Sequence, residues 1–183
     1  MPFAFSHLDP PLPRHHSYPE IEGLSIPDQF FWVRAGRPPL AGMQLPTKVI
    51  PWDELHRHGF RWIACLCSEH PLYDPFPLER LVSVELCDLA ETELPDDPEA
   101  EERSFGMIAD AIIRKLEEGE GVIVHCAGGR GRTGTLLGVV LVRLGYAAAD
   151  AISFLDEVHR SRGKAGWPES PWQSEVVHGA LRD

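Results

Sequence analysis

The sequence predicts an α/β fold with a central, mostly parallel sheet flanked by helices. Short apolar runs rich in β-branched residues alternate along the chain with segments whose apolar residues recur at helical spacing. One run, from Gly121 to Val124, passes through a glycine-rich loop into an almost wholly apolar helix that begins near Thr133. A helix that is apolar on all sides is expected at the centre of the molecule, packed against the sheet.

Each expected element has a local signal. Phe105, Ile108, Ile112 and Leu116 recur at helical spacing, and glycines follow several of the expected helices, where helices commonly end. The acidic, proline-containing segment 88–100 is expected to be a loop, with Asp96 and Asp97 in a solvated turn. The expected strands are 30–33, 40–42, 61–67, 81–86 and 122–124, and the expected helices are 52–58, 102–117, 133–144, 150–160 and 171–181.

The length and the N-terminal composition suggest how the chain is organised. A chain of 183 residues fits a single domain with a sizeable core. Residues 1–28 are rich in proline and histidine, so we expect an irregular arm that either wraps over the body or is partly disordered. The paired histidines His15 and His16 fit a solvated arm better than a metal site. The predicted domain comprises residues 29–183.

The composition argues against several classes of protein. The chain carries 17 Lys and Arg against 28 Asp and Glu, a net charge of −11, so neither nucleic acid nor an anionic membrane is an expected partner. It contains no apolar run of the roughly 18 residues that a membrane span needs, and its start lacks the pattern of a secretory signal. The cysteines at positions 65, 67, 87 and 126 lack metal-ligand spacing, which predicts reduced thiols in the cytoplasm.

The glycine-rich loop after Val124 has the composition of an anion-binding site. Five residues, three of them glycine, separate Cys126 from Arg132, and glycine lets a backbone fold tightly with its N–H groups turned inward. These N–H groups and the N-terminus of the next helix would form a cradle for one phosphate group. Arg132 can add a bidentate contact to the same anion. The predicted phosphate-binding residues are Ala127, Gly128, Gly129, Arg130, Gly131 and Arg132.

Cys126 is expected at the base of this cradle. A cysteine reacts as its thiolate, and the positive field that binds an anion also stabilises a thiolate. The alternative is a buried structural cysteine in a glycine-rich turn. The combination of a cysteine, a gap of five residues, an arginine and then a hydroxyl residue favours the nucleophile.

This stretch resembles the signature of the cysteine-dependent protein phosphatases, H-C-x-x-x-x-x-R-[S/T]. His125, Cys126, Arg132 and Thr133 match its defined positions. The stretch is similar to that of the small atypical dual-specificity phosphatases of bacterial, archaeal and animal type. The resemblance implies that 29–183 is a single cysteine-phosphatase domain with the fold of that superfamily. It also implies that Cys126 forms a phosphocysteine, Arg132 clamps the phosphate, Thr133 stabilises the departing thiolate and His125 orders the loop.

The resemblance further implies a general acid on a loop before the central strand. Asp88 follows the expected strand 81–86, at the position where the family carries its aspartate. The stretch from Asp88 to Cys126 is longer than in the family, and Glu91, four residues before Pro95, also fits the spacing of an acid and a following proline. Asp88 is the favoured acid and Glu91 is the alternative. Alternatively, Asp88 has only a structural role and caps the end of the strand.

Two other segments resemble parts of related phosphatases. The run around Leu66-Cys67-Ser68 resembles a strand of the phosphatase-and-tensin-homology lipid phosphatases, which implies that Cys67 forms a reversible disulfide with Cys126. Cys67 is equally well explained as a core residue, and Cys65, with the same strand parity, leaves the choice of redox partner open. The segment 167–173 resembles a loop that supports the phosphate loop in the family. Its predicted supporting residues are Glu169, Ser170 and Gln173, together with Arg162.

The sequence therefore favours a protein phosphatase acting on phosphotyrosine and, in a dual-specificity enzyme, on phosphoserine and phosphothreonine. The alternatives are a phosphoinositide phosphatase, an RNA 5′-phosphatase and a non-catalytic phosphopeptide-binding module. Lipid enzymes of the superfamily carry two lysines in the loop, where this chain has Ala127 and Arg130, so only one cation could serve. The binding modules usually lack the cysteine or the arginine, and this chain has both. The proposed chemistry needs no metal and no organic cofactor.

Overall fold

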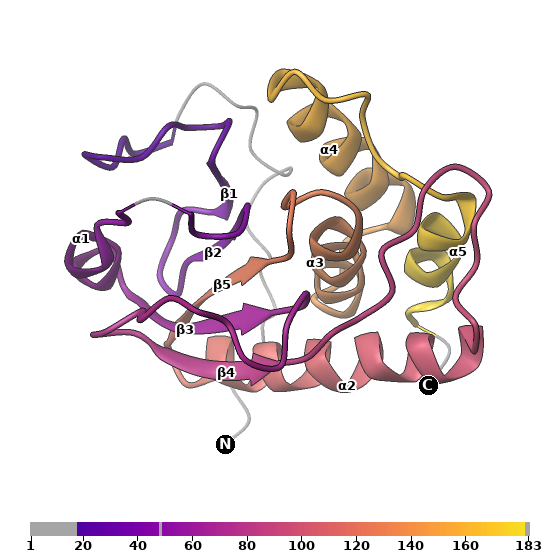
Figure 1. Cartoon of the computed structure of the whole chain (residues 1–183), viewed down its shortest axis with the longest axis horizontal. Helices are drawn as coiled ribbons and strands as arrows, with labels where there is room; N and C mark the ends of the chain where they lie inside the picture. The colour runs from indigo at the N-terminus through magenta and orange to yellow at the C-terminus, as the bar shows by residue number, and fades with distance from the viewer. Residues whose placement is uncertain (1–17, 48, 182–183) are drawn as a thin grey trace.

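A five-stranded sheet forms the centre of the protein, with the strand order β1-β2-β5-β3-β4 (Figure 1). The computed structural model describes residues 18–47 and 49–181. Strands β1 and β2 are antiparallel, and every other neighbouring pair is parallel, which confirms the predicted mostly parallel sheet. The strands are β1 (Phe30–Arg34), β2 (Leu40–Met43), β3 (Phe60–Cys65), β4 (Glu79–Ser83) and β5 (Gly121–His125).

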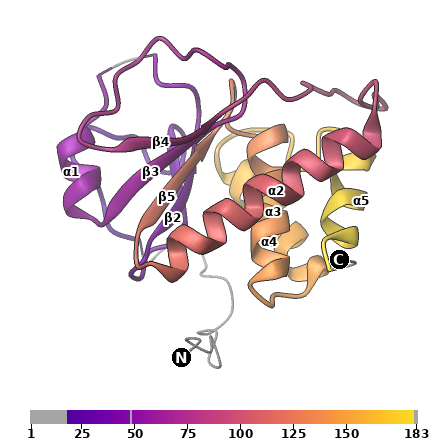
Figure 2. The same cartoon turned by 90° about the horizontal axis from the view of Figure 1, so that it is seen from below.

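Helices cover both faces of this sheet. The long helix α2 and the buried helix α3 pack against one face, where α4 and α5 in turn pack against α3, and the short helix α1 contacts β3 (Figure 2). Within the described ranges, no helix is both long and apolar enough to cross a membrane. The helices are α1 (Trp52–Arg57), α2 (Pro98–Glu117), α3 (Gly131–Arg143), α4 (Ala148–Ser161) and α5 (Pro171–Gly179).

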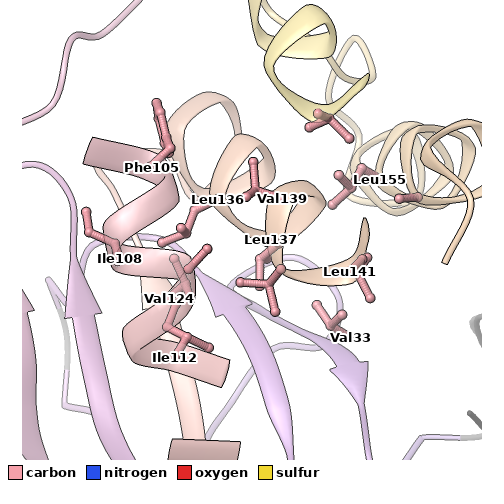
Figure 3. Close-up of a cluster of buried hydrophobic side chains, with 14 of the residues drawn as sticks. Val33, Phe105, Ile108, Ile112, Val124, Leu136, Leu137, Val139, Leu141 and Leu155 are labelled. Carbon is pink, nitrogen blue, oxygen red and sulfur yellow. The ribbon is translucent and has the colours of Figure 1, made fainter. Parts of the chain in front are cut away.

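Alternate residues of β5 enter two separate cores. Val122 and Val124 belong to the larger cluster beneath α2 and α3, which Figure 3 shows in close-up. Ile123 belongs to a smaller cluster on the other face, together with Leu55 of α1. Because both faces are covered, β5 is apolar without alternation, as expected for a central parallel strand. This double burial fixes the position of the strand that leads to Cys126.

The described part of the N-terminal arm packs against the body. Ile21 is buried in the smaller cluster, and the indole N–H of Trp32 donates a 2.9 Å hydrogen bond to the carbonyl of Pro19. Residues 18–28 therefore help to cover one face of the sheet. Residues 1–17, with His15 and His16, lie outside the described residues.

Helix α2 begins at Pro98, well before the predicted start at position 102. The side chain of Asp97 accepts a hydrogen bond from the backbone N–H of Ala100 and caps the helix. Asp97 is exposed in a bend, as predicted, but the predicted loop 88–100 was too long and the cap was missed. The Asp-Pro pair is a helix start signal, because the aspartate satisfies a free N–H and the proline needs none.

Strands β3 and β4 end at Cys65 and Ser83, earlier than predicted. The chain bends at Leu66, which ends the regular ladder. Backbone hydrogen bonds nevertheless continue, from the N–H of Val84 to Cys65 and from the N–H of Leu86 to Leu66. The predicted strands were therefore too long, although the two segments stay paired.

Candidate active site

The loop from Cys126 to Arg130 joins the carboxyl end of β5 to the first turn of α3 (Figure 1). Because β5 lies between β2 and β3, the loop emerges at the middle of the sheet edge. Ligands of open parallel sheets bind at this edge. The Cys126 side chain is almost fully buried, with 2% of its surface exposed, at the base of the loop.

The carbonyl groups of the loop point outward, toward donors of the surrounding protein. The carbonyl of Ala127 accepts from the N–H of Leu45 at 3.0 Å. The guanidinium of Arg162 donates to the carbonyl of Gly129 at 2.7 Å and to that of Gly128 at 3.2 Å. In a trans peptide the N–H lies opposite the C=O, so these contacts turn the following N–H groups toward the inside of the loop. This is the amide arrangement that an anion requires.

The loop glycines are needed for different reasons. Gly129 has a positive φ of 63°, and a Cβ there would collide with the backbone of Met43. A Cβ on Gly131 would collide with the side chains of Glu169 and Gln173. A Cβ on Gly128 would meet open space. The sequence predicts that all three glycines allow tight folding of the loop. In the structure this reason applies most directly to Gly129.

Arg132 is buried beside this loop and held from the β4 side. Its guanidinium donates to the carbonyl of Leu86 at 3.2 Å and pairs with the carboxylate of Asp88 at 3.0 Å. The Nε of Arg132 and the hydroxyl of Thr133 are also buried, and neither has a hydrogen-bond partner within the described part of the chain. Polar atoms buried in this way are suited to bind an anion that enters the loop.

The structure separates the two candidate acids. Asp88 reaches Arg132 although 69% of its side chain is exposed. Glu91 is exposed, lies in a turn with a positive φ of 50° and makes no ion pair among the residues described. Asp88 lies beyond the end of β4, so it is not a cap at the end of that strand.

Arg162 and His159, at the end of α4, support the loop from below. Besides its contacts to the loop, Arg162 donates to the carbonyl of Asp28 at 2.9 Å and lies 4.9 Å above the ring of Phe31. The ring of His159 is fully buried and accepts a 2.9 Å hydrogen bond from Arg162 through Nδ1. Burial and the charge of Arg162 lower the pKa of His159 to about 3, so the ring is neutral. His159 was not among the predicted site residues, because no sequence motif marks it.

The segment 166–173 supports the loop on another side. The side chain of Arg130 donates to the carbonyl of Gly166 at 2.5 Å and pairs with Glu169 at 3.0 Å. Gln173 accepts from the backbone N–H of Glu169 at 2.8 Å and forms a capping box with Ser170 at the start of α5. The structure thus brings Glu169, Gln173 and Arg162 against the phosphate loop and its junction with α3. Ser170 instead caps α5 and donates to the carbonyl of Glu93 at 2.7 Å. The indole of Trp167, which donates to the carbonyl of Gly131 at 3.3 Å, was not predicted.

His125 lies next to two cysteines. Its Nε2 is 2.5 Å from the hydroxyl of Tyr73, and its Nδ1 is 3.3 Å from the carbonyl oxygen of Cys126. Cys65 and Cys67 are close to this ring. A hydrogen bond from Cys67 lowers the pKa of the Cys65 thiol, and the same contact, with burial, raises the pKa of Cys67. The charge of Cys126 raises the pKa of Cys67 further, and Cys67 packs against the core cluster that contains Cys126.

A protein-family model matches most of the chain. The model describes the DSP-PTPase phosphatase domain of the Swiss Army Knife proteins, PTP-SAK, and it matches residues 27–167. The match begins before β1 and ends at Trp167, so it includes the whole sheet, the loop after β5 and helices α1 to α4.

Solved phosphatase structures share this fold. The active form of Tk-PTP is 25% identical, with a TM-score of 0.58 over 80% of this chain and 92% of that chain. Human DUSP28 is 17% identical, with a TM-score of 0.59 over 81% and 96% of the respective chains. PTPMT1, solved in complex with PI(5)P, is 16% identical, with a TM-score of 0.60 over 78% and 90%.

Proposed function

Because the chain belongs to the PTP-SAK family of DSP-PTPase phosphatase domains, we propose that it is a protein phosphatase that hydrolyses phosphotyrosine, and also phosphoserine and phosphothreonine. The observation that carries the proposal is the loop between Cys126 and Arg132. The carbonyl groups of the loop accept hydrogen bonds from the surrounding protein, so the loop amides turn inward. The buried guanidinium of Arg132 lies beside the loop. This environment suits a phosphate dianion bound next to the thiol of Cys126.

The proposed reaction proceeds in two displacements. In the first, the thiolate of Cys126 attacks phosphorus, the bond from phosphorus to the ester oxygen breaks, and Asp88 gives its proton to the departing oxygen. In the second, water attacks the phosphocysteine, Asp88 takes a proton from this water, and the thiolate of Cys126 leaves. The inward amides and Arg132 stabilise the charge on the equatorial oxygens. Thr133 would donate a hydrogen bond to the departing thiolate, and His125 would position the loop.

The charges around the loop favour a simple monoester as the substrate. The Arg130 side chain is bound to Gly166 and Glu169, so it is not directed at a second phosphate. Ala127 adds no charge. Arg132 thus supplies the cation for a single phosphate, which fits a phosphorylated side chain better than a polyphosphorylated inositol or a triphosphate.

The decisive experiment compares the substrate classes with one enzyme preparation. We expect turnover of p-nitrophenyl phosphate and of phosphotyrosine peptides, and slower or no turnover of phosphoinositides and RNA 5′-triphosphate. Cys126→Ser should abolish turnover yet retain phosphopeptide binding, because the loop amides and Arg132 remain. A Cys126→Ser variant with activity within about tenfold of wild type would contradict the covalent mechanism. A wild-type protein that binds phosphopeptides without turnover would instead be a binding module.

We also propose that Cys67 is the redox partner of Cys126. Peroxide would oxidise the Cys126 thiolate to a sulfenic acid, and the Cys67 thiol would then form a disulfide with it and release water. The expected result is reversible inactivation by mild peroxide, with a peptide that links Cys67 to Cys126. A map that shows only irreversibly oxidised Cys126, or a link through Cys65, would reject this pairing.

A further inference from the structure

We propose that Cys65, Cys67 and His125 form a binding site for a soft divalent cation, zinc in particular, behind the phosphate-binding loop. This site goes beyond the phosphatase function proposed above and does not depend on it. Spacing along the chain does not reveal it, because the histidine belongs to another strand. The fold brings the three donors together.

The sheet register places two of the donors side by side. Cys65 and His125 are paired residues on the neighbouring parallel strands β3 and β5, so their side chains leave the sheet on the same face. Ile63 and Ile123, two residues earlier on each strand, both belong to the smaller core cluster and identify that face. This is the face opposite α2 and α3.

Cys67 completes the set because the chain bends after β3. The bend at Leu66 brings Cys67 back toward the same point, and one potential ligand atom from each of the three residues lies within 4.8 Å of the others. In a tetrahedral zinc site with bonds of about 2.3 Å to sulfur and 2.0–2.1 Å to nitrogen, ligand atoms are roughly 3.5–3.8 Å apart. Side-chain rotations that shorten these separations by about 1 Å would create three corners of that site, and water would take the fourth.

The hydrogen bonds of His125 prepare it as a ligand. Its Nδ1 faces the carbonyl oxygen of Cys126 at 3.3 Å, so with the proton on Nδ1 the lone pair lies on Nε2, where it now accepts from the hydroxyl of Tyr73. Metal-binding histidines are commonly oriented by such a contact from their other nitrogen to a carbonyl. The hydroxyl of Tyr73, now 2.5 Å from Nε2, could turn to the water on the ion.

The donor set and its burial select the type of ion. Two thiolates and one imidazole suit zinc and other soft cations, whereas magnesium and calcium prefer oxygen. Cys65 and His125 are fully buried, and Cys67 is half-buried, so the ion could enter past Cys67. Cys126 belongs to the larger core cluster, against which Cys67 also packs, so Cys126 lies near one ligand without being one of the three donors. The ion and a phosphate should therefore occupy separate but neighbouring positions.

A cobalt titration of the reduced, full-length protein tests the site directly. We expect one cobalt ion per chain, with thiolate charge-transfer absorption in the near ultraviolet and the visible bands of four-coordinate cobalt, and we expect zinc to displace it. Cys67→Ser and Cys65→Ser should each weaken binding by at least about tenfold and reduce the charge-transfer absorption. Cys87→Ser, a cysteine outside the cluster, is the matched control and should bind as the wild type does.

The variant Cys126→Ser separates this site from the phosphate loop. It should retain the thiolate absorption of bound cobalt, and saturating orthovanadate should not displace cobalt from the wild type. Loss of the spectrum in Cys126→Ser with retention in Cys67→Ser would overturn the proposal, and so would the absence of thiolate absorption in the folded wild type. If the buried variant Cys65→Ser does not fold, the wild-type and Cys67→Ser spectra decide.

Discussion

The carboxylate of Asp88 lies 3.0 Å from the buried guanidinium of Arg132, while most of its side chain faces solvent. It can therefore contact the group that would hold the phosphate and still exchange protons with water. Glu91 has no such contact among the described residues. The geometry favours Asp88 as the proton donor to the leaving group.

Asp88→Asn should lower the rate for phenyl and alkyl phosphates by about 10²–10⁴, the usual contribution of a positioned general acid. The loss should be much smaller for a substrate whose leaving group departs without a proton, because attack by Cys126 and clamping by Arg132 are unchanged. The measurement is kcat across phosphates of increasing leaving-group pKa.

Glu91→Gln is the paired control and should keep the wild-type dependence on the leaving group. If Glu91→Gln shows the steep dependence and Asp88→Asn does not, the acidic loop places Glu91 over the phosphate and the assignment of Asp88 is wrong. If neither variant shows the steep dependence on the leaving group, the proton comes from water or from another residue.

The sequence was informative about single residues where the chemistry is local. Cys126 begins a short loop and Arg132 lies in the first turn of α3 directly after it, so their spacing alone indicated an anion site. The contact between Tyr73 and His125 spans 52 positions, and the one between Arg162 and Gly129 spans 33. Strand order and helix packing bring such pairs together, and a local sequence pattern does not specify either of them.

Among the elements, α2 shows how a local signal can be missed. Its apolar residues begin at Phe105, so hydrophobic spacing places the start of the helix late. The first turn, from Pro98, is polar, and it is held by the Asp97 cap rather than by packing. Periodicity therefore predicts the buried part of a helix better than its solvated start.

Asp97→Ala should lower the free energy of unfolding by about 1 kcal/mol, the typical cost of losing an N-cap side chain. The loss arises because the N–H of Ala100 no longer has its carboxylate acceptor. Urea denaturation followed by circular dichroism measures it. Asp96→Ala removes a neighbouring acid that is not the cap and should cost much less. Equal losses in both variants would show that the effect comes from loop charge and not from capping.

At the scale of the whole molecule, the phosphate loop is supported by parts from both ends of the described chain. Arg162 joins the loop to Asp28 and packs on Phe31 of β1. The family fold and its parallel sheet could be predicted because alternating strands and helices specify that architecture. The resemblance implied that Arg162 supports the loop, but its contacts to Asp28 and Phe31 could not be predicted, because they depend on where α4 ends relative to β1.

His159, in this buried junction, should make the stability of the protein sensitive to acid. Its pKa is lowered to about 3 by burial and by the charge of Arg162, from an ordinary value of 6.5. Between these two values the unfolded chain binds a proton that the folded chain excludes. The contribution of His159 to the free energy of unfolding is therefore greatest above pH 6.5. It decreases as the pH falls, by up to about 1.4 kcal/mol per pH unit.

Urea unfolding at a series of pH values between 7 and 4 tests this effect. His159→Gln should be less stable than wild type at pH 7, because the ring packs edge-on against Phe31, yet its stability should decline less steeply as the pH falls. His178→Gln, at an exposed position of α5, should keep the wild-type slope. Parallel curves for His159→Gln and wild type would show that His159 is not the acid-sensitive group. The carboxylates would then account for the loss, since their protonation is the other common cause of acid unfolding.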